Sequence, residues 1–190
     1  MCKTFFSSTM IRKIVPHKTL IIFFLSILFY SPAQANWEPA KKGNKIILIR
    51  HSIAPGSGDP SNFKIDDCKT QRNLSQKGID QSKRIGKLFK KNQIQIDQVL
   101  SSQWCRCKDT AKYAFNNFKE FSALNSTFQS PYDKNEKKQI KALREYIQKW
   151  SGNGGNLVLV THYVIITAIT DVAPRSGEIV IIDKNFNTLS

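Results

Sequence analysis

Three stretches of strand length, each followed at once by polar residues, constrain the fold of this chain more than any other feature. Residues 45–49 form an apolar run that leads into Arg50-His51, and residues 157–161 lead into His162. A third stretch, 96–101, ends in Ser101 and is followed by Ser102. Short apolar runs of this length are typical of strands that are buried on both faces of a parallel sheet.

Segments with helical periodicity lie between and after these strands. Ser75 has the residue type of an N-cap and predicts a helix over 76–92, with Ile79, Ile85, Leu88 and Phe89 on its apolar side. The other expected helices span 107–117 and 136–150, and residues 165–170 form the start of a further one. A last strand is expected at 178–182. Alternating strands and helices predict an α/β domain, a three-layer α/β/α sandwich with a mostly parallel central sheet.

The strand ends carry the residues that suggest chemistry. In such sheets ligands bind outside the carboxyl ends of the strands. That edge would hold Arg50 and His51, then Ser101 and Ser102 leading to Arg106, and finally His162. A neutral imidazole is a good nucleophile towards phosphorus, and arginine forks bind phosphate oxygens. The pattern therefore indicates a phosphoryl-binding site.

Residues 1–35 have the pattern of a secretory signal peptide. A basic start precedes the apolar run 20–30, and "SPAQA" then supplies small residues, which predicts cleavage after Ala35. The run is shorter than the roughly 20 apolar residues that span a bilayer, although an uncleaved anchor remains an alternative. We expect an exported domain, residues 36–190, in the periplasm of a Gram-negative cell, with no stable membrane span in the mature chain.

The charge of the mature part favours anionic partners without choosing among them. Four of the 29 basic residues and none of the 14 acidic ones lie in residues 1–35, which leaves a net charge of +11 for the rest. Such a surface attracts phosphorylated substrates, anionic head groups or nucleic acid. No basic block is interleaved with aromatic residues, so no nucleic-acid partner is expected. The oligomeric state stays open.

The cysteines of the mature chain suggest a disulfide and no metal site. Exported proteins keep disulfides, so Cys68 is expected to pair with Cys105 or Cys107. The Cys-x-Cys spacing is not that of a metal site, and only two histidines remain in the mature chain. A structural zinc is therefore not expected.

Four segments in order resemble the histidine phosphatase superfamily, which has the phosphoglycerate mutase-like fold. They are "LIRHS", "NLSQKG", "SSQWCRCKDTA" and "LVLVTHY", and the resemblance runs over residues 46–182. It implies that His51 is the phosphorylated nucleophile and that Arg50, Arg106 and His162 complete the phosphate pocket. It implies a phosphatase that acts on a phosphomonoester and needs neither a metal nor an organic cofactor.

The sequence departs from the family pattern at the residues expected to protonate the leaving group. Ser126 occupies the position where one branch carries Glu, and Tyr163 follows His162 where the other branch carries an acidic residue. A separate departure is Ser52, which replaces a common Gly and is expected to be tolerated. Asp59 is the preferred candidate for the general acid. The alternatives are Asp66, Asp67 and Glu178, or a substrate whose leaving group needs little protonation, such as a phosphohistidine or an anomeric or acyl phosphate.

The sequence also suggests two substrate-binding residues, a class of substrate and an alternative function. Arg72 and Asn73 are candidates for substrate binding, with an ion pair or loop support as the structural alternatives. The expected substrate is a phosphorylated small molecule or envelope glycan, such as a phosphorylated sugar of lipopolysaccharide. The alternative function is a catalytically degenerate family member that binds anionic glycans or phosphorylated protein without turnover.

Overall fold

A five-stranded sheet forms the centre of this computed structural model, which describes residue 1 and residues 36–190. The strand order is β3-β2-β4-β1-β5, with β5 antiparallel to β1 and the other pairs parallel. The strands are β1 (Ile46–Arg50), β2 (Ile96–Ser101), β3 (Lys119–Glu120), β4 (Asn156–Thr161) and β5 (Ile179–Ile182). The expected mostly parallel α/β sheet is confirmed.

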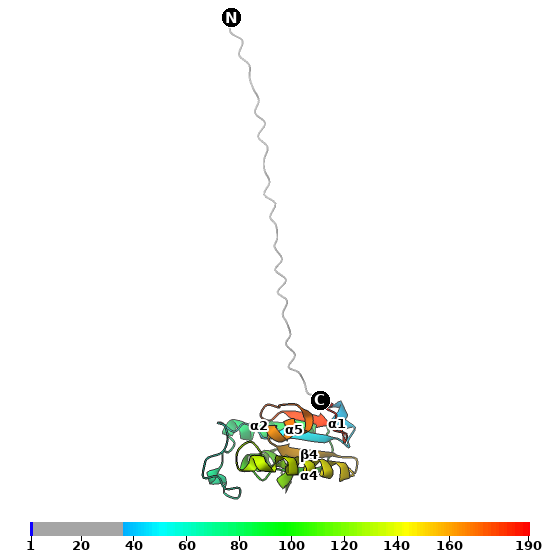
Figure 1. The fold of residues 1–190 in the computed structure, drawn as a ribbon. Helices are drawn as coiled ribbons and strands as arrows, with labels where there is room; N and C mark the ends of the chain where they lie inside the picture. The colour runs from blue at the N-terminus through cyan, green and yellow to red at the C-terminus, as the bar shows by residue number, and fades with distance from the viewer. Residues whose placement is uncertain (2–35) are drawn as a thin grey trace. The chain divides into compact units, whose positions relative to one another are not determined.

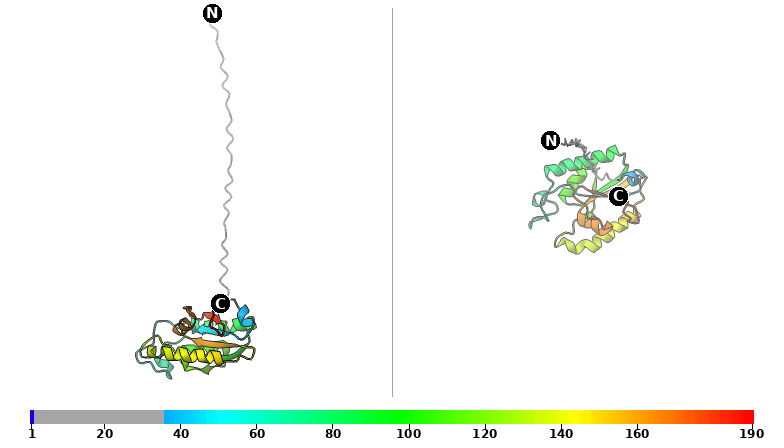
Figure 2. Two further views of the ribbon diagram at one scale, coloured as in Figure 1. Left: turned by 45° about the vertical axis from the view of Figure 1, so that its right-hand side comes forward. Right: turned by 90° about the horizontal axis from the view of Figure 1, so that it is seen from above.

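Helices cover both faces of the sheet (Figures 1 and 2). The right-hand view of Figure 2 shows α2, in green, on one side and α4, in yellow, on the other. The α-helices are α1 (Glu38–Lys41), α2 (Gln76–Lys91), α3 (Cys105–Phe115), α4 (Glu136–Lys149) and α5 (Tyr163–Thr170). Short 3-10 helices are η1 (Cys68–Thr70), η2 (Ser122–Leu124) and η3 (Tyr132–Asn135). The three-layer arrangement matches the expected one.

The alternation of side chains along β1 builds two cores. Ile46 and Leu48 lie in the core that includes residues of α4 and α5, whereas Ile47 and Ile49 lie in the core that includes residues of α2 and α3. All residues of β4 are buried as well. Because successive residues of a strand point to opposite faces, a strand covered by helices on both sides favours apolar residues on both of its faces. This accounts for the continuous runs in the sequence.

The pairing of the strands sets the positions of the residues that follow them. Arg50 lies opposite Thr161 in the parallel pair of β1 and β4. The ladder continues past the strand ends, because the His51 amide donates to the Thr161 carbonyl at 2.8 Å and the Ser102 amide to the Val160 carbonyl at 2.9 Å. The backbone at His51 and Ser102 is therefore fixed by sheet hydrogen bonds at one edge.

Two helices begin two residues earlier than the sequence predicts. The backbone of Trp104 is extended and its carbonyl accepts from the amides of Cys107 and Lys108, so α3 begins at Cys105. In the same way His162 is the N-cap of α5, which begins at Tyr163. Arg106 and Tyr163 consequently lie in the first turns of their helices.

The short elements β3 and α1 have no counterpart in the sequence prediction, and neither do the three 3-10 helices. β3 is a two-residue edge strand made of Lys119 and Glu120, and α1 is a single turn, so neither is long enough to show a periodic pattern. The predicted signal peptide lies outside the described residues. Among the described helices, none is both long and apolar enough to cross a membrane.

The contact between α2 and α3 predicts that replacing a helical glycine by alanine destabilises the protein, which is the opposite of the usual effect. Alanine in place of a helical glycine normally stabilises a helix by about 0.5–1 kcal/mol. A methyl group on Gly86 would instead clash with the Ala114 carbonyl of α3. We expect Gly86→Ala to lower the free energy of unfolding by about 1–3 kcal/mol in urea titrations. Lys87→Ala, at the next and exposed position, should change it little; equal behaviour of the two variants would contradict this packing.

Candidate active site

The ends of β1 and β4 and the first turn of α3 line a cavity of about 70 Å³ that brings together the four principal residues singled out in the sequence. Typical ligand pockets are roughly 300–1,000 Å³, so this one has room for a small group and not for a whole substrate. Its lining comprises Arg50, His51, Gly56, Ser57, Gly58, Arg72, Arg106, Ser126, Phe128, His162 and Tyr163.

His51 follows β1 and is buried, with one ring nitrogen occupied. Its Nδ1 lies 2.8 Å from the carbonyl oxygen of Ser52, and because a carbonyl only accepts, Nδ1 carries the proton. The Nε2 lone pair is thus left unprotonated. Burial, and then the positive charge of Arg106, lower the pKa of His51 to about 3. The imidazole is neutral at neutral pH, the form that can act as a nucleophile.

His162 follows β4 and is held by the end of β2 and by α3. Its Nε2 lies 3.0 Å from the Ser102 hydroxyl and 3.4 Å from the Cys107 sulfur. Its ring centroid is 5.4 Å from that of His51. Burial and the charge of Arg106 lower the pKa of His162 well below its ordinary value. The second histidine is therefore also neutral and fixed beside the first.

Arg106, in the first turn of α3, is oriented by a buried ion pair with Asp59. Its Nη1 and Nη2 atoms donate to the two carboxylate oxygens at 2.7 and 3.1 Å, and both side chains are almost completely buried. The Trp104 indole donates to the same carboxylate at 2.9 Å, and so does the Arg72 amide at 3.1 Å. Asp59 thereby fixes the direction of the guanidinium plane.

The environment of Asp59 argues against its expected role as proton donor. Burial raises the pKa of Asp59, but the hydrogen bonds and charge of Arg106 outweigh this effect and hold the pKa below its ordinary value. The carboxylate is therefore ionised at neutral pH and has no proton to give. The geometry assigns it a positioning role towards Arg106 instead.

Arg50, which is half-buried, and Arg106, which is buried, both line this pocket and retain unused donors. Arg50 donates from Nη1 to the Pro174 carbonyl at 2.9 Å, and its guanidinium carbon lies 5.1 Å from the centre of the Tyr163 ring. Within the described part of the chain, the Nε atoms of Arg50 and Arg106 have no hydrogen-bond partner. Buried donors without partners are costly, so this pattern fits a site that an anion completes.

Arg72 and Asn73 are placed differently from one another. Arg72 lines the cavity and donates to the carbonyls of Gly58 and Ala54, so it braces the loop after β1 and adds positive charge to the pocket. Asn73 is exposed and donates to the backbone carbonyls of Cys68 and Gln71. Its contacts support the loop, and it does not line the cavity.

A disulfide connects this loop to α3. Cys68 is bonded to Cys105, which decides between the two pairings that the sequence left open. The Gln71 side chain reinforces the connection by accepting from the Cys105 amide at 2.9 Å. Among the described cysteines, Cys107 remains a thiol, and burial raises its pKa to about 12. A thiol of this kind is inert at neutral pH.

The sequence identifies some residues of the pocket lining but not its aromatic residues. Ser126 does line the cavity, and its hydroxyl accepts from the Phe128 amide at 3.3 Å. Phe128 and Tyr163 were not predicted as pocket residues. The position of Tyr163 directly after His162 was the available signal. The other acidic candidates, which do not line the cavity, are Asp66, Asp67 and Glu178.

Within residue 1 and residues 36–190, no group of three or more His, Cys, Asp or Glu side chains is arranged to hold an ion.

The architecture is similar to that of several solved phosphatases. Phosphoserine phosphatase from Entamoeba histolytica, solved with 3-phosphoglyceric acid, superposes with a TM-score of 0.57 and 14% identity over 77% of this chain and 95% of its own. The protein histidine phosphatase SixA, solved with tungstate, superposes with a TM-score of 0.53 and 14% identity over 76% of this chain and 92% of its own.

A mycobacterial glucosyl-3-phosphoglycerate phosphatase in complex with VO3 gives a TM-score of 0.54 and 13% identity over 73% of this chain and 92% of its own. Neither a protein-family model nor a curated protein matches the sequence. The structural likeness therefore establishes the fold, and function must be argued from the site.

The buried histidines predict that acid destabilises the protein well above the range in which carboxylates titrate. The unfolded chain protonates histidine below pH about 6.5, whereas His51 in the folded chain stays neutral down to its pKa of about 3. The free energy of unfolding should thus fall by on the order of 2 kcal/mol per buried histidine between pH 7 and pH 5. Urea titrations across this range should show a shallower dependence for His51→Gln, and identical slopes would contradict the assignment.

The disulfide predicts a stability loss on reduction. Cys68 and Cys105 are 37 residues apart, and a closed loop of this size stabilises the folded state by about 3–4 kcal/mol. Cys68→Ser should lower the free energy of unfolding by that order, and dithiothreitol should destabilise the wild type while leaving the variant unchanged. A reductant effect of equal size on both proteins would show that the bond contributes nothing.

Proposed function

We propose that this protein is a phosphatase that hydrolyses a phosphomonoester through a covalent phosphohistidine at His51. The observation that carries the proposal is the pocket itself. A neutral imidazole with an available Nε2 shares a cavity of about 70 Å³ with Arg50 and Arg106, whose Nε atoms are buried and have no hydrogen-bond partner among the described residues. The fold, shared with solved phosphatases, supports the same function.

In the first step the phosphoryl group occupies the cavity and Arg50 and Arg106 bind its oxygens. The Nε2 lone pair of His51 forms the N–P bond while the P–O bond to the leaving group breaks and its electron pair goes to the leaving oxygen. The Ser52 carbonyl, which accepts from Nδ1, steadies the positive charge that develops on the ring. The arginines stabilise the charge on the equatorial oxygens of the transition state.

In the second step water attacks the phosphorus, and the P–N bond breaks with its electron pair returning to His51. Inorganic phosphate leaves and the neutral imidazole is restored. His162 lies beside the transferred group and is proposed to contact its oxygens. The proposal needs neither a metal nor an organic cofactor, because the guanidinium groups supply the positive charge that phosphoryl transfer requires.

The size of the cavity bears on the substrate. Because only a phosphoryl group fits inside, the rest of the substrate lies outside the cavity, whose lining includes Phe128 and Tyr163. We propose a phosphorylated small molecule or an envelope glycan, with a phosphorylated sugar of lipopolysaccharide as the specific candidate. Solved neighbours carry the names of phosphatases for phosphoserine, protein histidine and glucosyl-3-phosphoglycerate, so the fold is compatible with diverse leaving groups.

We further propose that the protein is exported and works in the periplasm after cleavage behind Ala35. The leader pattern of residues 1–35 supports this, and so does the disulfide between Cys68 and Cys105, since such bonds persist in oxidising compartments. An envelope substrate would be within reach there.

A second candidate function is binding without turnover, to anionic glycans or phosphorylated protein. It is favoured by one observation: among the described residues, the only carboxylate in contact with the pocket arginines is Asp59, which is ionised. The availability of the His51 Nε2 favours catalysis, because binding alone does not require a nucleophile.

Phosphate release by purified protein distinguishes the two candidates. Wild type and His51→Ala would be assayed with 4-nitrophenyl phosphate, phosphohistidine and phosphorylated envelope sugars. We expect wild-type turnover that falls roughly 10³-fold or more in the variant, while Lys87→Ala, an exposed position on α2, behaves as wild type. Equal release by wild type and His51→Ala would contradict the phosphatase, and tight binding without release would establish the second candidate.

A further inference from the structure

The pocket has a nucleophile and a phosphate clamp but no evident donor for the leaving group. This inference rests on the proposed phosphatase. An alkoxide is a poor leaving group, so an alkyl phosphate needs a proton on its bridging oxygen as the P–O bond breaks. Asp59 is ionised, and both histidines are neutral, with the Nδ1 proton of His51 directed to the Ser52 carbonyl.

Three hydroxyl groups line the cavity and are the remaining candidates: Ser57, Ser126 and Tyr163. The two serines are aliphatic alcohols, which are no more acidic than the alcohol that must leave. Ser126 is also buried, and its oxygen accepts from the Phe128 amide. A phenol is a stronger acid than an alkyl alcohol and still retains its proton at neutral pH. Chemistry therefore favours Tyr163.

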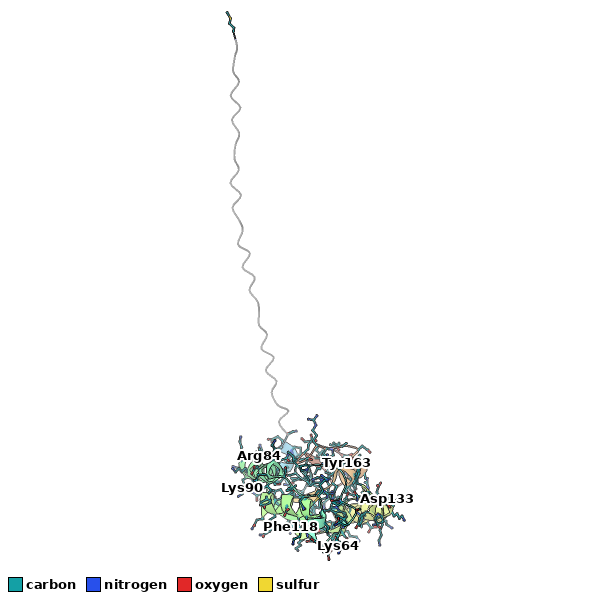
Figure 3. The ribbon with its side chains drawn as sticks, turned by 90° about the vertical axis from the view of Figure 1, so that its left-hand side faces the viewer. Lys64, Arg84, Lys90, Phe118, Asp133 and Tyr163 are labelled. Atoms are coloured by element: carbon teal, nitrogen blue, oxygen red, sulfur yellow. A yellow bond between two sulfur atoms is a disulfide. The ribbon has the colours of Figure 1, made fainter. Side chains whose placement is uncertain are left out.

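The backbone holds Tyr163 in the lining of the cavity. It is the first residue of α5, directly after His162, whose carbonyl accepts from the amides of Ile165 and Ile166. The ring is half-buried and packs edge-on against Phe128, at 5.8 Å between centroids. Figure 3 labels this side chain at the start of the helix. Within the described residues, its hydroxyl makes no hydrogen bond to protein and is available to a ligand.

Arg50 supplies the charge that a proton donor of this type needs. Its guanidinium carbon lies 5.1 Å from the centre of the Tyr163 ring, so a phenolate formed during the reaction would lie beside a fixed cation. Burial lowers the pKa of Arg50, and the neighbouring Tyr163 acts on it in the opposite direction.

We propose that Tyr163 is the general acid that protonates the leaving group. As the His51 Nε2–P bond forms and the P–O bond breaks, the electron pair of that bond stays on the leaving oxygen, which takes the Tyr163 hydroxyl proton. The resulting phenolate is stabilised by Arg50. In the second step the phenolate accepts a proton from the attacking water, and the P–N electron pair returns to His51, so both residues regain their starting states.

The test compares leaving groups that differ in their need for a proton. Glycerol phosphate has an alkoxide leaving group, whereas 4-nitrophenolate leaves without protonation. Tyr163→Phe removes only the hydroxyl and keeps the ring against Arg50 and Phe128, so the fold should be retained. We expect kcat/KM, which reports on the phosphoryl transfer to His51, to fall by ~10²-fold or more for glycerol phosphate and to stay nearly unchanged for 4-nitrophenyl phosphate.

The matched control is Tyr113→Phe. Tyr113 lies on α3, is exposed, and also has a cation beside its ring, with Lys83 at 5.8 Å. It lines a separate groove with Lys90 and Phe118, both of which lie apart from Tyr163 in Figure 3. This variant should match the wild type with both esters.

Each result bears on one claim. Equal losses with both esters, or no loss with either, would overturn the role of Tyr163 while the proposed phosphatase stands on its dependence on His51. A wild type that cleaves 4-nitrophenyl phosphate but no alkyl phosphate would also overturn the general acid. Failure of the wild type to cleave any ester would overturn the phosphatase, and the general acid with it.

Discussion

The hydrogen-bonded register of β1, β4 and β2 is the constraint on which the rest of the site depends. Arg50 lies opposite Thr161, and the amides of His51 and Ser102 extend the ladder beyond the strands. Helices on both faces bury these strands, so their ends cannot shift without disturbing two cores. A loop alone would not hold two imidazole rings 5.4 Å apart with this precision; the sheet does so through its backbone.

Charge is the second constraint, and it acts on every group in the pocket. Three guanidinium groups line a small cavity, and Asp59 is the carboxylate that pairs with one of them. The surplus of positive charge, together with burial, keeps both histidines neutral, and it leaves donors that an anion would satisfy. The same imbalance explains why a phenol beside Arg50 is a reasonable acid here. A free carboxyl group among these arginines would be ionised, as Asp59 is.

The sequence predicted the parts of this picture that depend on periodicity and chain order. Continuous apolar runs identify buried strands, and the polar residues after them then fall at one edge, which places His51, Arg106 and His162 together. The partner of Asp59 could not be predicted, because the ion pair with Arg106 joins residues 47 apart through a loop of irregular conformation. In the sequence, Tyr163 is notable only because it stands after His162, where one branch of the family carries an acidic residue. Its contact with Arg50 could not be predicted, because that contact depends on the direction in which α5 follows β4.

The most direct test of the central claim is to detect the phosphoryl group on His51 during turnover. Purified protein would be mixed with 4-nitrophenyl phosphate, quenched in alkali within milliseconds to preserve acid-labile phosphate, and digested for mass spectrometry. The account predicts a phosphorylated peptide with the modification on His51, stable in base and lost in acid, and none in His51→Ala. Turnover with no phosphate on His51, or with phosphate on another residue, would contradict it.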